Sequence, residues 1–140
     1  MYRTQQGFGL RNSLITIAII VVSLVFVISK LPKGYSDDVS TVGKGTNVAL
    51  LLHDKNTMTS LDLMGLMDEV RDDYVNQVDF IVVNIDVATP KERVFVQQQQ
   101  MGNAAILLFS PAGERLKVFM DIRNVGTFRK ILNDTFQLKP

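Results

Sequence analysis

The chain contains no cysteine among its 140 residues. Disulfide bonds, thiol catalysis and cysteine-ligated metal centres are therefore excluded for this chain. A single histidine, His53, also excludes a histidine-rich metal site within one chain, because such a site needs several imidazole ligands. Excess charge of one sign is missing as well. The formal net charge is +1, so no bulk electrostatic attraction to nucleic acid is expected.

Charged residues are absent from one long stretch near the N-terminus. Arg11 and Lys30 bracket 18 uncharged residues, and the segment from Leu14 to Ile28 is apolar on all sides. A helix of this length spans roughly 27 Å, close to the thickness of the hydrocarbon core of a bilayer. We therefore predict a transmembrane helix at residues 13–30, preceded by a short tail at residues 1–12.

A cleaved signal peptide is the alternative, because basic residues precede the apolar run. The following "VISKLPKGYS" lacks a small-x-small cleavage site, which favours an uncleaved signal anchor. Lysine and arginine are nearly balanced on the two sides, so the positive-inside rule gives little guidance on orientation. The short N-terminal tail favours a single-pass protein of the inner (cytoplasmic) membrane, with its C-terminal domain in the periplasm or otherwise outside the cytoplasm.

The segment after the apolar helix is rich in proline, glycine, serine and aspartate. This composition predicts an extended linker at residues 31–46, followed by one folded domain at residues 47–140. Hydrophobic spacing predicts four strands and three helices in the domain. The strands are at 47–52, 79–86, 104–109 and 115–120, and the helices begin near Leu63, at Thr89–Pro90 and near Val125.

Buried strands that are separated by helices favour parallel pairing, whereas the tight turn at "SPAGE" favours an antiparallel hairpin. The sequence therefore predicts an α/β domain, in which helices flank a mixed sheet. The order strand–helix–strand–helix–strand–strand–helix resembles that of the thioredoxin fold. "LMDEVRDDYVNQVDFIVVNID" is similar to the thioredoxin stretch from the first long helix into the next strand. "MGNAAILLFSPAGE" is similar to the family's Gly-x-Pro-Thr loop with the strand and hairpin that follow.

The resemblance covers residues 47–136 and implies a thioredoxin-like fold. It places the family's Cys-x-x-Cys motif at "TMTS", residues 57–60, its buried acid at Leu51 and its cis-proline at Ala104. Thiol–disulfide exchange requires a thiolate, which a hydroxyl cannot replace. We therefore expect a redox-inactive protein rather than an enzyme, with no catalytic residue, cofactor or metal. A non-proline cis bond costs about 2.5–4 kcal/mol, so we expect a trans peptide before Ala104.

A degenerate, active-site-like loop is the candidate site for partner contact. Its residues are His53, Thr57, Met58, Thr59, Ser60 and Ala104. A hydroxyl nucleophile with His53 as its base is a catalytic alternative, but only the neighbouring Asp54 offers an orienting group. We expect Thr57 or Thr59 to cap the following helix, and His53, at the end of a strand, to face solvent or an interface.

Two other groups of residues are candidates for binding. The methionines Met58, Met64, Met67 and Met101 suit an adaptable apolar surface, although Met64 and Met67 fit the core or its edge better. The second group is an acidic cluster that consists of Asp68, Glu69, Asp72 and Asp73. These residue types can bind a cation, but an acidic cluster on a helix is most often a solvated face.

Together these features favour a non-catalytic accessory, scaffolding or assembly subunit of a membrane protein complex, with other subunits as partners and no identified small-molecule substrate. A membrane-tethered peptide-binding or chaperone-like module, which would use the loops at 57–60 and 102–105, is the first alternative. An enzyme with unrecognised chemistry is another. "QQGFGL" also faintly resembles a prepilin cleaved between Gly7 and Phe8, which suggests a pilin-like secretion component, but that family's glutamate falls at Asn12.

Overall fold

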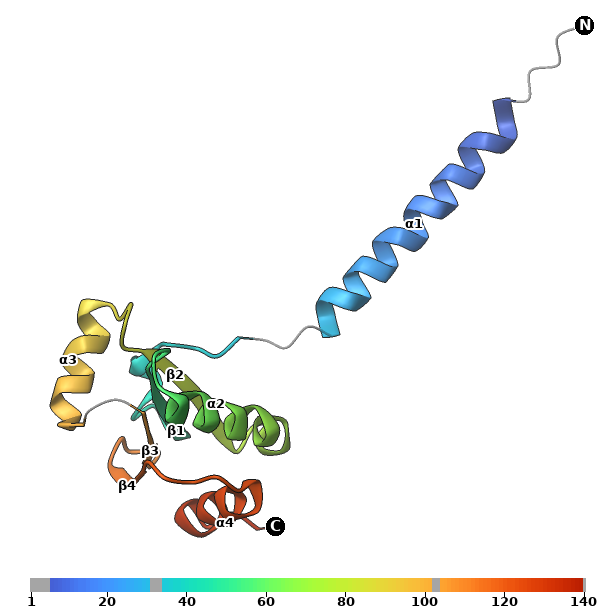
Figure 1. The fold of residues 1–140 in the computed structure, drawn as a ribbon. Helices are drawn as coiled ribbons and strands as arrows, with labels where there is room; N and C mark the ends of the chain where they lie inside the picture. Colours follow the sequence, from blue (N-terminus) through green and yellow to red (C-terminus); the bar gives the residue numbers. More distant parts are fainter. Residues whose placement is uncertain (1–5, 31–33, 102–103, 140) are drawn as a thin grey trace, which may run out of the picture. The chain divides into compact units, whose positions relative to one another are not determined.

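The computed structural model describes residues 6–30, 34–101 and 104–139. The chain divides into two compact units, Met1–Gly34 and Tyr35–Pro140, and we call the second unit the head. The first unit contains helix α1 (Gln6–Lys30; Figure 1). Its segment Gly9–Ser29 has a mean hydropathy of 2.5, with none of it buried. Helix α1 is therefore long and apolar enough to cross a membrane.

The head is built on a four-stranded mixed sheet in the order β2-β1-β3-β4. The strands are β1 (Asn47–His53), β2 (Val78–Asn84), β3 (Ala105–Phe109) and β4 (Arg115–Phe119). β1 is parallel to β2, and β3 and β4 are antiparallel, so the predicted parallel pair and hairpin are confirmed. β3, however, is antiparallel to β1 although a helix precedes it. It lies on the other side of β1 from β2, so the helix between β2 and β3 does not join neighbouring strands.

Helices cover both faces of the sheet, which confirms the α/β class. Three longer helices and two short 3-10 helices belong to the head: α2 (Met58–Val70), α3 (Pro90–Gln99), α4 (Val125–Phe136), η1 (Val39–Thr41) and η2 (Arg71–Tyr74). Side chains of α2 and α4 contribute to one hydrophobic core, and side chains of α3 and η1 to a second. Figure 1 shows α3 apart from α2 and α4, with the sheet between them.

Strand β1 divides its side chains between the two cores. Ala49 and Leu51 face the core that contains Met67, whereas Leu50 faces the core against which Phe95 packs. This alternation follows from the two-residue period of a strand, and a buried leucine contributes about 1.5–3 kcal/mol. Since β1 is buried on both faces, its carboxyl end is a fixed point from which the next loop starts.

Residues 35–46, which we call the strap, are the first part of the head and pack onto the rest of it. The backbone N–H of Val82 donates to the carbonyl of Ser36 at 3.0 Å, so Ser36 pairs with the outer edge of β2. Val39 is only 5% exposed and belongs to the second core. The head therefore begins at Tyr35, and not at Asn47 after a fully extended linker as the composition predicts.

Further contacts hold both ends of the strap. At its start, the hydroxyl of Tyr35 donates to Asp68 at 2.5 Å, and the guanidinium of Arg71 lies 4.2 Å from the centre of the Tyr35 ring. The second contact is a cation–π interaction. At its end, the N–H of Gly45 donates to the carbonyl of Pro111 at 3.0 Å, in the turn between β3 and β4. The strap thus connects α2, the edge of β2 and the hairpin.

Strand β4 forms the opposite edge of the sheet. The side chains of Arg115, Leu116 and Lys117 are exposed, and those of Val118 and Phe119 are half-buried. This matches the half-exposed strand that the alternating sequence predicts.

Candidate functional site

The loop between β1 and α2 is organised by Asp54. Its side chain accepts the N–H of Asn56 at 2.9 Å, and its carbonyl accepts the N–H of Thr57 at 3.2 Å. Thr57 occupies the N-cap position, but its hydroxyl donates back to the carbonyl of Asp54 at 3.2 Å. The expectation that a threonine hydroxyl caps α2 is therefore wrong, because the Thr57 side chain makes no hydrogen bond to a helix N–H.

Ser60 lies at the centre of a buried polar cluster behind this loop. It is 0% exposed, and its hydroxyl oxygen lies 2.7 Å from Nδ1 of His53. The same oxygen accepts the backbone N–H of Asp54 at 2.9 Å. His53 is itself only 8% exposed, so it does not face solvent as its place at a strand end suggests. The imidazole ring points inward because it forms a hydrogen bond with the Ser60 hydroxyl of α2.

The two ring nitrogens of His53 differ in their surroundings. Nδ1 shares a hydrogen bond with the Ser60 hydroxyl, and either group can donate, because a hydroxyl has one proton and two lone pairs. Nε2 has no hydrogen-bond partner within the described residues. Since no fully buried side-chain nitrogen or oxygen of those residues lacks a partner, Nε2 must be in contact with solvent.

The remaining residues of the predicted loop point elsewhere. Met58 is 72% exposed at the first turn of α2, and Thr59 beside it is exposed as well. Ala104 is 8% exposed, and its N–H donates to the carbonyl of Leu52 at 2.9 Å. Ala104 also has a φ of 56°, a left-handed conformation that alanine rarely adopts. The peptide before Ala104 begins at residue 103, outside the described residues.

The four methionines do not form one surface. Met67 is fully buried in the first core and Met64 packs against it, as predicted, whereas Met101 packs against the second core. Leu51, where the resemblance places the family's buried acid, is fully buried between apolar neighbours. Only Met58 of the four methionines therefore presents a large exposed area.

The acidic cluster on α2 and η2 is a solvated face. Asp68, Glu69, Asp72 and Asp73 are all exposed. Asp68 accepts the hydroxyl of Tyr35, and Asp73 forms an ion pair with Arg129 at 2.5 Å. Over the part of the chain that the structure describes, no group of three or more histidine, aspartate or glutamate side chains is arranged to hold a metal ion.

A cleft of about 400 Å³ opens beside this loop. It is lined by Tyr35, Asp37, His53, Met64, Val82, Asn84, Val87, Thr89 and Glu92. His53 is the last residue of β1 and Asn84 the last of β2, so the cleft lies at the carboxyl ends of the parallel pair. This edge of an α/β sheet is a common place for ligands.

Of these lining residues, the sequence alone pointed only to His53 and Met64 as candidates for binding or catalysis. The ends of the two strands predicted to be parallel were a usable signal for Asn84. No signal was available for Tyr35 and Asp37, since they belong to a segment that reads as a linker.

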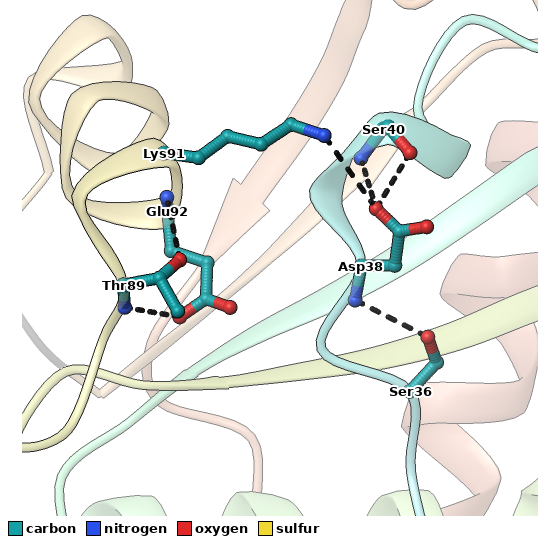
Figure 2. A network of polar contacts seen from close by, with 6 residues as sticks. All are labelled: Ser36, Asp38, Ser40, Thr89, Lys91 and Glu92. Carbon is teal, nitrogen blue, oxygen red and sulfur yellow. Dashed lines mark hydrogen bonds and ion pairs between the residues drawn. The ribbon is translucent and has the colours of Figure 1, made fainter.

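The wall of the cleft at α3 is fixed by a capping box. Thr89 accepts the N–H of Glu92 at 3.4 Å, and Glu92 Oε2 accepts the N–H of Thr89 at 2.9 Å. This confirms Thr89 as the predicted N-cap of the helix that begins at Pro90. Glu92 is only 9% exposed. In Figure 2 one of its carboxylate oxygens lies on the Thr89 N–H, and the second carries no contact to the residues drawn.

The strap forms the facing wall through its own hydrogen bonds. Ser40 donates to Asp38 through its hydroxyl at 2.5 Å and its N–H at 3.0 Å, and these bonds lower the pKa of Asp38 (Figure 2). Lys91 of α3 lies 3.9 Å from the same carboxylate. Burial raises the pKa of the Tyr35 hydroxyl, as does its hydrogen bond to Asp68.

Comparison of the chain with models of known protein families and with curated proteins finds no match. The resemblance to the thioredoxin family therefore rests on element order and local sequence.

Proposed function

We propose that the chain is a non-catalytic, redox-inactive accessory or assembly subunit of a membrane protein complex. In this proposal α1 is a single-pass anchor in the inner membrane, and the head is a thioredoxin-like domain outside the cytoplasm. The order of elements from β1 to α4, with one parallel pair followed by a hairpin, supports the thioredoxin-like assignment.

The buried position of Ser60 is the observation that carries the proposal. Ser60 stands where the resemblance places a thiol, but its hydroxyl is 0% exposed and bound to His53 and Asp54. A nucleophile must touch its substrate, and a fully enclosed hydroxyl does not. The Thr57 hydroxyl is also engaged, with the Asp54 carbonyl. The hydroxyls of Thr57 and Ser60 thus stabilise the loop, and Met58 is its large exposed apolar residue, available for contact with a partner.

Peptide binding by the second loop is less well supported. In the family, that loop helps to hold extended peptides by backbone pairing. Here the N–H of Ala104 already donates to the carbonyl of Leu52, so it is not available to a client. A partner subunit that contacts the Met58 side chain needs no free backbone group in this loop. The structure of the head therefore supports subunit contact better than peptide binding.

Co-purification of the full chain tests the proposal. The chain, tagged at its C-terminus, is extracted in a mild detergent and its associated proteins are quantified. We expect one set of partners in fixed stoichiometry, which Met58→Glu disrupts and Met120→Glu, at a second exposed methionine, leaves intact. Glutamate is well tolerated in the first turn of a helix, so Met58→Glu should fold. A protein that emerges alone and monomeric would refute the subunit role.

The absence of cysteine allows a direct test of membrane topology. Single variants Thr4→Cys and Lys139→Cys are treated in intact cells with a membrane-impermeant maleimide. We expect labelling of Lys139→Cys only, because the head is placed outside the cytoplasm. The intact mass of the purified chain distinguishes the anchor from its alternatives: a mature protein that begins at Phe8 indicates the pilin-like alternative, and loss of the whole α1 segment indicates a signal peptide.

A further inference from the structure

Two nearly buried polar groups of the cleft retain unused hydrogen-bonding capacity. Glu92 is 9% exposed, and the one bond to its carboxylate is the Thr89 N–H on Oε2. His53 is 8% exposed, and its Nε2 has no hydrogen bond within the described residues, whereas Nδ1 is bonded to Ser60. Because no buried side-chain oxygen or nitrogen of the described residues lacks a partner, the spare atoms of both groups are open to solvent. The cleft is the hollow that both residues line.

The charge of the cleft has one sign. Asp37 and Glu92 contribute carboxylates, whereas the lining contains no lysine or arginine. Lys91 of α3 extends to Asp38 on the strap. The capping box and the N-terminus of α3 stabilise the charge of Glu92, but one of its carboxylate oxygens has no hydrogen bond and can attract a cation in the cleft.

Part of the remaining lining is apolar, beside the polar side chains of Tyr35, Asn84 and Thr89. Met64, Val82 and Val87 provide a surface for an alkyl chain, next to the carboxylates. A volume of about 400 Å³ is within the range of small-ligand sites and exceeds what a bare metal ion needs. Carboxylates beside an apolar wall match a group that has a positive head on a hydrocarbon stem.

We propose that this cleft binds an alkyl ammonium or guanidinium group, of the kind carried by a lysine or arginine side chain. Glu92 and Asp37 bind the positive head, Met64 and Val82 contact the stem, and Nε2 of His53 forms a hydrogen bond with a polar group of the same ligand. This goes beyond the proposed function, because the cleft is a separate surface from Met58 and would bind such a group whether or not the head is a subunit.

The single histidine makes the site directly observable by NMR. The full chain is labelled with 15N and 13C in histidine only, purified in detergent micelles through a tag without histidine, and titrated. The probes are Nα-acetyl-lysine methylamide, its uncharged counterpart Nα-acetyl-norleucine methylamide, and n-butylamine. We expect a saturable shift of the His53 ring signals with the lysine probe and at least tenfold weaker binding of the norleucine probe.

Matched variants show whether a loss of binding comes from the missing carboxylate charge or from unfolding of the head. Glutamine suits the third position of a capping box, so Glu92→Gln removes the charge while it preserves the cap. We expect Glu92→Gln and Asp37→Asn each to raise the Kd for the lysine probe at least tenfold. Glu114→Gln, at an exposed acid outside the cleft, should leave the Kd unchanged. Asp37 is exposed, so its variant keeps the test valid even if Glu92→Gln unfolds.

The third probe distinguishes the source of the cation. Saturation by n-butylamine as tight as by the lysine probe indicates a site for free amines, and saturation by the lysine probe alone indicates a polypeptide side chain. Either result supports a cation site. The proposal is overturned if no probe gives a saturable shift, if the norleucine probe binds as tightly as the lysine probe, or if neither acidic variant weakens binding.

Discussion

At the scale of single residues, Ser60 links the end of β1 to the start of α2. Its hydroxyl accepts the Asp54 N–H and shares a hydrogen bond with Nδ1 of His53, so three polar groups are satisfied inside the protein. The cost of leaving any of them without a partner in a buried site is larger than the net gain from one hydrogen bond.

We therefore expect Ser60→Ala to destabilise the head by about 1–3 kcal/mol, because it removes the hydroxyl that binds His53 Nδ1 in a buried site. The exposed neighbour in the control Thr59→Ala should change the free energy of unfolding by less than about 0.5 kcal/mol. Chemical denaturation of both full-length variants, followed by circular dichroism, measures the difference. Equal stability of the two variants would show that the buried cluster contributes nothing.

Tyr35 gives a prediction about pH. Burial and the hydrogen bond to Asp68 raise the pKa of Tyr35 in the folded protein, while Arg71 partly opposes this. A tyrosine in the unfolded chain loses its proton near pH 10, whereas Tyr35 in the folded protein keeps its proton at that pH. Raising the pH above about 10 therefore favours the unfolded state and lowers the free energy of unfolding.

Tyr35→Phe should remove this part of the pH dependence, since phenylalanine does not titrate. Denaturation midpoints of the wild type and Tyr35→Phe between pH 8 and pH 11 test the expectation, and the late tyrosinate absorbance of Tyr35 should be missing from the spectrum of the variant. Parallel pH profiles would contradict it.

Residue-level prediction from sequence succeeds where the cause is local. Thr89 followed by Pro90 predicts a helix start, and the structure has it, because capping depends on residues within one turn. His53 is different. Its inward orientation depends on Ser60, seven positions later, and on the angle at which α2 leaves the loop. Neither hydrophobic periodicity nor residue type contains that information.

At the scale of elements, the strap is the feature that composition hides. Glycine, proline, serine and aspartate predict an extended linker, and such a segment has no period from which packing can be read. Val39 is buried in the second core, Val42 packs against the same core, and Ser36 pairs with β2. These contacts are set by the position of β2 at the sheet edge, which depends on the whole topology. The strands and helices themselves were predictable, since they rest on repeated spacing.

Val39→Ala should loosen the strap without unfolding the head. Loss of two buried methyl groups costs about 1.6 kcal/mol, and the control Val75→Ala, at a residue 61% exposed, should cost much less. The Val82 N–H depends on the strap for its partner, so its hydrogen exchange should become faster in Val39→Ala. Exchange of this amide at the wild-type rate would mean that the strap stays in place without Val39.

At the scale of the whole molecule, the boundary between the two units falls at Gly34 and Tyr35. We expect a fragment of residues 35–140 to fold by itself, because it retains Val39 and the partner of Val82. A fragment of residues 47–140 lacks the strap and should unfold at a lower denaturant concentration. Denaturation of the two purified fragments provides the comparison, and identical midpoints would place the true boundary near residue 47.

The two edges of the sheet also affect how heads would meet if the proposed anchor confined them to one surface. An open strand edge can pair with the same edge of a neighbouring chain, and crowding in two dimensions favours such pairing. Ser36 occupies part of the β2 edge with the chain's own backbone, and the β4 edge carries the positive side chains of Arg115 and Lys117. Heads that approach one another edge to edge would meet either an occupied edge or like charge, and both oppose strand pairing between copies.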